Sequence, residues 1–232
     1  MIELRPRAEL GGANHGWLHA RHHFSFAGYH DPARMHWGRL RVWNDDSIAP
    51  HSGFPTHSHQ DMEIITYVRK GAITHEDSLG NRGRTVAGDV QVMSAGTGIA
   101  HSEHNLEDEV TELFQIWIYP DQTGLAPAWG TRPFPTGERS GAFVTLASGM
   151  PGDTDALPIN ADARLVAATL SAGQVAEYRM GSGRKVYLVP ASGRIEVGGM
   201  IAAVGDGLAV RDETLLTVKA LEDSEVVLVD VR

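Results

Sequence analysis

The stretch "GFPTHSHQDMEIITYVRKG" at residues 53–71 decides the fold, because it joins a strand pattern to a cluster of possible metal ligands. Its second half, "EIITYV" at 63–68, is a short apolar run of the kind that forms strands. Alternate residues of a strand point to the same face, so His57, His59 and Glu63 share a face if the strand is regular. The stretch therefore predicts a β-strand that carries ligand-type side chains on one side.

Similar short apolar runs recur along the chain, separated by turns rich in glycine and proline. The sequence holds 26 glycines and 11 prolines, while helical periodicity is scarce. Many short strands with frequent turns indicate an all-β sandwich or barrel. The runs are "GRLRVW" (38–43), "DVQVMSA" (89–95), "ELFQIWIY" (112–119), "RKVYLVPA" (184–191), "GRIEVG" (193–198) and "SEVVLVDVR" (224–232).

The strand pattern occurs twice in the same order. Tyr67 aligns with Tyr187, and the pair Gly88-Asp89 aligns with Gly205-Asp206. We interpret this as two copies of one β-fold. All 12 histidines lie between residues 15 and 104, so the second copy keeps the strands and lacks the polar cluster. The cluster is therefore not needed for folding, which favours a functional role.

The repeat suggests domain boundaries. We expect a first domain over residues 1–120, a linker over 121–139 and a second domain over 140–232. The linker is proposed because residues 120–138 hold four prolines and little periodicity.

Composition excludes several classes of protein. The formal net charge is −9, without a basic cluster, which argues against binding to nucleic acid. The chain has no cysteine, so disulfides, thiolate ligands and a cysteine nucleophile are excluded. We expect no membrane association and a cytoplasmic protein, since neither a secretory signal nor an apolar run of about 20 residues is present.

A second motif, "GDVQVMSAGTGIAHSEHN" at 88–105, places His101 and Glu103 on one face of another strand. A lone H-x-H is commonly structural. The two motifs together, however, supply three imidazoles and one carboxylate. This set suits a divalent first-row metal: we expect Fe(II) first, with Mn, Ni, Co, Cu or Zn as alternatives. Spacing alone leaves open whether the carboxylate is that of Glu63 or Glu103.

These motifs resemble the two sequence motifs of the cupin superfamily. Together with three flanking stretches, they resemble the pirin family, in particular its bacterial quercetin 2,3-dioxygenase-like branch. The likeness is specific over residues 17–120 and loose over 140–232. The flanking stretches are "RHHFSFAGYHDP" (21–32), "LRVWNDDSIAP" (40–50) and "LFQIWIYP" (113–120).

The resemblance implies two tandem cupin domains, which are jelly-roll β-barrels, with the C-terminal one degenerate. It implies that His57, His59, His101 and Glu103 hold the metal. Glu63 would then support the site, for instance by orienting a ligand histidine.

The activity implied by the resemblance is that of an oxidoreductase, a metal-dependent dioxygenase. It would open the C ring of a flavonol such as quercetin with O2 and release carbon monoxide. Glu103 would be the catalytic proton acceptor. Phe26, Phe54 and Met93 are expected to line the pocket, with Gln115 on a semi-polar strand face.

Other interpretations stay open. The second interpretation is a regulatory protein, since eukaryotic pirins look like metal-dependent regulators that bind a protein partner without catalysis. The third is a cupin isomerase or another metal-dependent enzyme, because a fold does not determine a function. We expect a monomer, because two fused cupin domains already form the pair that single cupins make by dimerising.

Four further residues receive simpler interpretations from the sequence. Asp45 and Asp46 are expected to form a turn after a strand. His75 and His104 are expected at the surface or beside the ligands.

Overall fold

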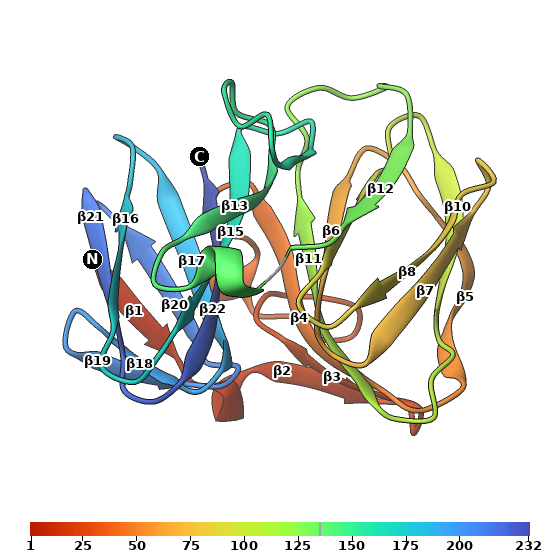
Figure 1. Ribbon diagram of the computed structural model, residues 1–232. Helices are drawn as coiled ribbons and strands as arrows, with labels where there is room; N and C mark the ends of the chain where they lie inside the picture. The colour runs from red at the N-terminus through yellow and green to blue at the C-terminus, as the bar shows by residue number, and fades with distance from the viewer. Residues whose placement is uncertain (135) are drawn as a thin grey trace.

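The computed structural model describes residues 1–134 and 136–232, and strands dominate it. Figure 1 shows two β-sandwiches side by side, the first formed mainly by the N-terminal half of the chain and the second by the C-terminal half. Each sandwich has one seven-stranded and one four-stranded sheet. The expected all-β fold with two tandem β-domains is confirmed.

The first sandwich consists of two antiparallel sheets. Its seven-stranded sheet has the order β12 (Ala128–Arg132), β9 (Val90–Ser94), β6 (Glu63–Lys70), β11 (Thr111–Ile118), β4 (Leu40–Ile48), β3 (Leu18–His22) and β2 (Gly11–Asn14). Its four-stranded sheet has the order β5 (Ser52–His59), β10 (Ile99–Asn105), β7 (Ala72–Asp77) and β8 (Arg82–Val86).

The second sandwich repeats this arrangement. Its seven-stranded sheet has the order β1 (Ile2–Arg5), β20 (Gly207–Arg211), β17 (Lys185–Ser192), β22 (Ser224–Val231), β15 (Ala163–Leu170), β13 (Val144–Ser148) and β14 (Leu157–Pro158). Its four-stranded sheet has the order β16 (Val175–Arg179), β21 (Leu215–Ala220), β18 (Arg194–Val197) and β19 (Met200–Ala203). In the described part of the chain, three short 3-10 helices complete the fold: η1 (Arg7–Glu9), η2 (Pro32–Arg34) and η3 (Thr136–Arg139).

The internal repeat predicted from the sequence is visible in the strand order. The run β9-β6-β11-β4 of the first sandwich corresponds to β20-β17-β22-β15 of the second. Two segments cross the expected domain boundaries. Strand β1 pairs with β20 of the second sandwich, and β12, which lies in the expected linker, pairs with β9 of the first. The boundaries at residues 120 and 140 remain a prediction.

The two seven-stranded sheets share one apolar core. Trp43 of the first sandwich lies 5.7 Å from Tyr187 of the second, measured between ring centroids, and Phe24 lies 5.0 Å from the same ring. Both sheets add fully buried aliphatic residues to this cluster. Burial of apolar area on this scale is the main force that holds the sandwiches together.

The interiors of the two sandwiches differ in content. Apolar side chains fill the second one, among them Leu188, Leu208 and Val218. Among the described residues, the interior of the first holds two small apolar clusters, and a cavity lies between its sheets. The second copy thus fills the corresponding interior mainly with apolar side chains, and it carries no histidine.

Strand β4 corrects one sequence interpretation. Asp45 and Asp46 form no turn, because both lie inside β4 and are buried. Asp45 faces the second sandwich, where it is paired with Arg7 (3.1 Å) and Arg69. Asp46 lines the cavity of the first sandwich. The two side chains have opposite environments because neighbouring residues of a strand point to opposite faces.

No helix in the described part of the chain is long and apolar enough to cross a bilayer.

Candidate metal centre

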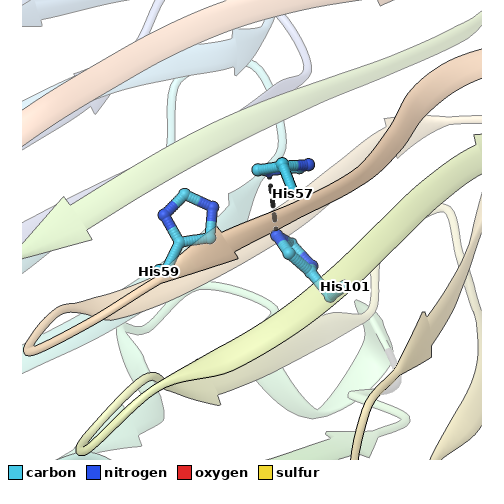
Figure 2. Close-up of side chains that lie close together, drawn as sticks. All are labelled: His57, His59 and His101. Carbon is cyan, nitrogen blue, oxygen red and sulfur yellow. Dashed lines mark hydrogen bonds between the residues drawn. The ribbon is translucent and has the colours of Figure 1, made fainter.

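Three histidines converge on the four-stranded sheet of the first sandwich. Strands β5 and β10 are antiparallel neighbours, and their register places His57 directly opposite His101. The side chains of His57, His59 and His101, which we call the three-histidine group, point toward one another (Figure 2). One ring nitrogen of each lies within 4.8 Å of those of the other two. The sequence interpretation that two distant motifs meet in space is consistent with this geometry.

Hydrogen bonds orient two of these rings. Nδ1 of His57 donates to the carbonyl oxygen of Pro55 at 2.8 Å, which leaves its Nε2 with a free lone pair. Nδ1 of His101 lies 3.4 Å from Nδ1 of His75, and Nε2 of His75 lies 3.0 Å from a carboxylate oxygen of Asp77. If Nε2 of His75 donates to Asp77, then Nδ1 of His75 accepts a hydrogen bond from Nδ1 of His101. Nε2 of His101 then carries no proton, and its lone pair is free to bind a metal ion.

The protonation states suit metal binding. Burial, together with the neighbouring His57, lowers the pKa of His59 to about 4. Burial and the other nearby histidines lower the pKa of His101 to about 3. Both imidazoles are therefore neutral at pH 7, which is the form that binds a metal ion.

The spacing of the group also fits one ion. Nε2 of His57 and Nε2 of His101 lie 3.1 Å apart. Two nitrogens at about 2.0–2.1 Å from one metal are separated by roughly 3 Å when the angle at the metal is near 90–100°. Two converging lone pairs without a proton between them repel each other, and a cation removes this repulsion. The residues present therefore fit a divalent transition metal.

Glu103 lies beside the three-histidine group and is almost fully buried. Its Oε2 accepts from Nε2 of Gln115 at 2.6 Å, and its Oε1 accepts from Nε2 of Gln91 at 2.6 Å and from Oγ1 of Thr66 at 3.2 Å. The carboxylate lies within 4.8 Å of ring nitrogens of His101 and His75. Burial raises the pKa of Glu103 to about 7, and the three hydrogen bonds oppose this shift.

The donors to Glu103 belong to a polar row that crosses the seven-stranded sheet. In the strand register, His22 is opposite Asn44, Asn44 opposite Gln115, Gln115 opposite Thr66, and Thr66 opposite Gln91. All five side chains are buried. The row fixes the Glu103 carboxylate from the facing sheet, so both sheets of the sandwich contribute to the site.

Glu63 lies apart from this group. It accepts from Oγ of Ser94 at 2.6 Å and from Nδ2 of Asn160 in the second sandwich at 3.3 Å. The assumption that His57 to Glu63 form one regular strand is wrong, because β5 ends at His59 and β6 starts at Glu63. A turn with Asp61 at φ +48° separates them, so the alternation rule does not extend across it.

The cavity beside the three-histidine group has a volume of about 500 Å³. Phe26, Phe54 and Gln115, which the sequence suggested as lining residues, do line it. Met93 does not belong to the lining and packs instead with Ile64 and other apolar residues.

The site contains further residues outside the set of ligands and lining residues expected from the sequence. Trp117 lines the cavity, and its ring lies 5.0 Å from that of His59, edge to face. Asn44 and Asp46 line it from β4, and their spacing of two residues in "RVWNDDSI" (41–48) was the available signal. His75 is fully buried and stacks on Trp129 at 4.8 Å.

Comparisons with known proteins agree with this geometry. The Pirin family model matches residues 3–118, and the model of the quercetinase C-terminal cupin domain matches residues 145–231. A pirin-like protein of Caulobacter vibrioides is 63% identical over 230 residues and covers 99% of each chain. A quercetin 2,3-dioxygenase of Escherichia coli K12 is 42% identical over 232 residues, with 99% of this chain and 98% of the relative covered.

A comparison with solved structures also points to the pirin family. The bacterial pirin YhhW of Escherichia coli, in complex with nickel(II), superimposes with a TM-score of 0.93 at 40% identity, covering 100% of this chain and 99% of that one. With two matching family models, relatives above 60% identity and this structural likeness, the chain belongs to the pirin family.

Proposed function

We propose that this protein is a metal-dependent dioxygenase that opens the C ring of a flavonol such as quercetin with O2 and releases carbon monoxide. One observation carries the proposal: three imidazoles and a buried carboxylate stand at the wall of a largely apolar cavity of about 500 Å³. Relatives of similar length are named quercetin 2,3-dioxygenase, and this supports the same assignment.

The metal would be held by the three-histidine group, with Glu103 as the carboxylate of the site. Fe(II) is our first choice and Mn, Ni, Co, Cu or Zn are alternatives, since imidazole and carboxylate ligands accept all of these ions. When bound, the ion supplies Lewis acidity that acidifies and orients the 3-hydroxyl of the flavonol. The nickel complex of YhhW supports the choice of a divalent transition metal.

In the proposed reaction, Glu103 takes the proton of that hydroxyl. Its side chain lines the same cavity as the histidines, and Gln91 and Gln115 fix its two oxygens from the facing sheet. A carboxylate held in this way needs no reorientation when a substrate arrives, which is the condition for efficient general base catalysis.

The cavity walls suit a flat aromatic molecule. Phe26, Phe54 and Trp117 line the cavity, and the Phe26 and Trp117 rings meet edge to face at 5.4 Å. Aromatic rings of this kind favour edge-to-face or offset contact with another ring.

The overall reaction balances without a further reductant. One flavonol and one O2 give one ring-opened ester and one carbon monoxide, with carbon 3 of the C ring leaving as the monoxide. Both atoms of O2 are retained among these two products. The polypeptide only binds, orients and accepts or returns a proton.

The test is O2 uptake and loss of flavonol absorbance by metal-loaded protein with quercetin. We expect both with wild type and with His104→Ala, which alters a histidine of the same strand outside the cavity lining. We expect neither with His101→Ala. Fully metal-loaded wild type that consumes neither substrate would exclude the dioxygenase and favour a pirin-like regulatory protein that binds a partner.

A further inference from the structure

Asp46 is a buried carboxyl group in the cavity that the proposed chemistry does not use. Only 2% of its surface is exposed, and it lines the cavity from β4. Its cross-strand neighbours are Ala20 on β3 and Leu113 on β11, both apolar. Among the residues that the structure describes, no side chain or backbone group donates a hydrogen bond to its Oδ1.

The neighbouring Asp45 is a carboxylate of the same strand that has a structural role, and it serves as a comparison. Asp45 is equally buried but is paired with Arg7 and Arg69 between the two sandwiches. A buried polar group without a partner is unfavourable, and native proteins keep few of them. An unpaired carboxyl that faces a ligand cavity is therefore retained at a cost to stability, which indicates a role in binding.

The surroundings of Asp46 define the hydrogen bonds it can make. Burial, Asp45 and Glu103 all raise the pKa of Asp46 well above its ordinary value, with Arg69 opposing them. A protonated carboxyl can donate one hydrogen bond and accept another. On the same strand face, Oδ1 of Asn44 lies 2.9 Å from Nδ1 of His22, so a second polar group adjoins Asp46.

Asp46 also lies on the opposite wall from the three-histidine group. It belongs to the seven-stranded sheet, whereas His57, His59 and His101 belong to the four-stranded sheet. A flat ligand whose 3-hydroxyl lies at the histidines would present its other ring hydroxyls to different parts of the cavity.

We propose that Asp46, with Asn44 beside it, binds a ring hydroxyl of the substrate other than the 3-hydroxyl and thereby selects polyhydroxylated flavonols. This inference rests on the proposed function and refines its substrate class. A phenolic hydroxyl both donates and accepts, and so matches a carboxyl group in either protonation state. A site that is built to bond a hydroxyl rejects the analogue that lacks it, because its own polar group is then left unpaired.

The test compares two ligands under nitrogen with Zn(II)-loaded protein, so that binding is measured without turnover. Quercetin is one ligand, and 3-hydroxyflavone, which keeps the ring system and the 3-hydroxyl but has no other hydroxyl, is the second. For Asp46→Ala we expect the Kd of quercetin to rise about tenfold and that of 3-hydroxyflavone to change less than twofold. Asp108→Ala, which removes an almost fully exposed carboxylate, should change neither.

Three binding results would overturn the inference: an equal effect of Asp46→Ala on both ligands, no effect on either, or wild type that binds neither. Turnover under air is scored separately. Selective binding without turnover would leave the role of Asp46 intact and refute only the dioxygenase.

Thermal unfolding of the metal-free protein gives an independent test. Because Asp46 has no partner for its buried oxygen, Asp46→Asn should keep or raise the Tm, by about 2–4 °C at most. A clear fall in Tm, or failure of both Asp46 variants to fold, would show a structural role and contradict the inference.

Discussion

His75 lies directly behind His101, with their Nδ1 atoms 3.4 Å apart, and on its other side it meets Asp77 at 3.0 Å. This line of three side chains runs from a buried carboxylate to the three-histidine group. Partners of this kind fix the tautomer and the ring orientation of a ligand histidine. His75 is thus a positioning residue for the candidate metal centre. The sequence left open whether it lies at the surface or beside the ligands, and the structure places it beside them.

The first prediction concerns this contact. His75→Phe keeps an aromatic ring for stacking on Trp129 but removes the bond to His101. We expect metal affinity to fall about 10- to 100-fold, because His101 loses the partner that fixes its tautomer. Competition with a chromophoric chelator measures the Kd. His51→Phe is the matched control, since His51 also bonds a carboxylate, Asp108, but at the surface. Equal metal affinities of both variants and wild type would refute the positioning role.

The second prediction separates the two candidate carboxylates. Glu103→Ala should lower the metal content of the purified protein markedly, because its carboxylate lies within 4.8 Å of a ring nitrogen of His101, one of the three-histidine group. Glu63→Ala should leave the metal content near that of wild type, since Glu63 instead bonds Ser94 and Asn160. Elemental analysis of both variants decides between them. Loss of metal from the Glu63 variant alone would mean that the carboxylate of the site has been misassigned.

The third prediction concerns the polar row. Gln115→Met removes a 2.6 Å hydrogen bond to the buried Glu103 and leaves one carboxyl oxygen without its donor. We expect the free energy of unfolding to fall by about 1–3 kcal/mol, measured with urea. Gln122→Met, at an exposed position, should change it by less than about 0.5 kcal/mol. Similar values for the two variants would show that the bond to Glu103 contributes nothing to stability.

The fourth prediction concerns pH. His23 is fully buried at the contact between the sandwiches, with Nδ1 2.9 Å from the Tyr187 hydroxyl. Burial, and then nearby Arg5, lower the pKa of His23 from 6.5 to about 3. Between these values the unfolded chain binds a proton that the folded chain does not, so stability falls as pH decreases below 6.5.

From pH 7.5 to 5.5 this histidine should account for a loss of about 1.4 kcal/mol in the free energy of unfolding. His23→Gln should lose correspondingly less over the same interval, as urea unfolding at the two pH values would show. An unchanged pH dependence in the variant would mean that His23 is not the group responsible.

The sequence was most informative where a pattern is local. Alternating apolar runs predicted the strands, and the repeat predicted the shared strand order of the two sandwiches. The pairs H-x-H and H-x-E each occupy one strand, so the alternation rule placed His57 near His59. Residues that depend on register between strands could not be found in this way. Gln91, Thr66 and Gln115 form a row only because β9, β6 and β11 are aligned.

Two errors have specific physical causes. Glu63 was assigned to the strand of His57 because nothing in "QDM" (60–62) marks a turn strongly, yet Asp61 adopts a positive φ there. The sequence predicts a turn at Asp45 and Asp46 because adjacent aspartates are rare in buried strands. Asp45 forms ion pairs with two arginines that are distant in the sequence, and Asp46 lines a cavity. Neither the arginines nor the cavity can be predicted from the residues around the two aspartates.

The most direct test of the central claim is the ratio of carbon monoxide released to quercetin consumed by metal-loaded protein under air. The account predicts one carbon monoxide per quercetin for wild type, and loss of both signals in His101→Ala. Quercetin loss without carbon monoxide, or no quercetin loss at full metal occupancy, would contradict the assignment of the cavity as a flavonol-opening centre.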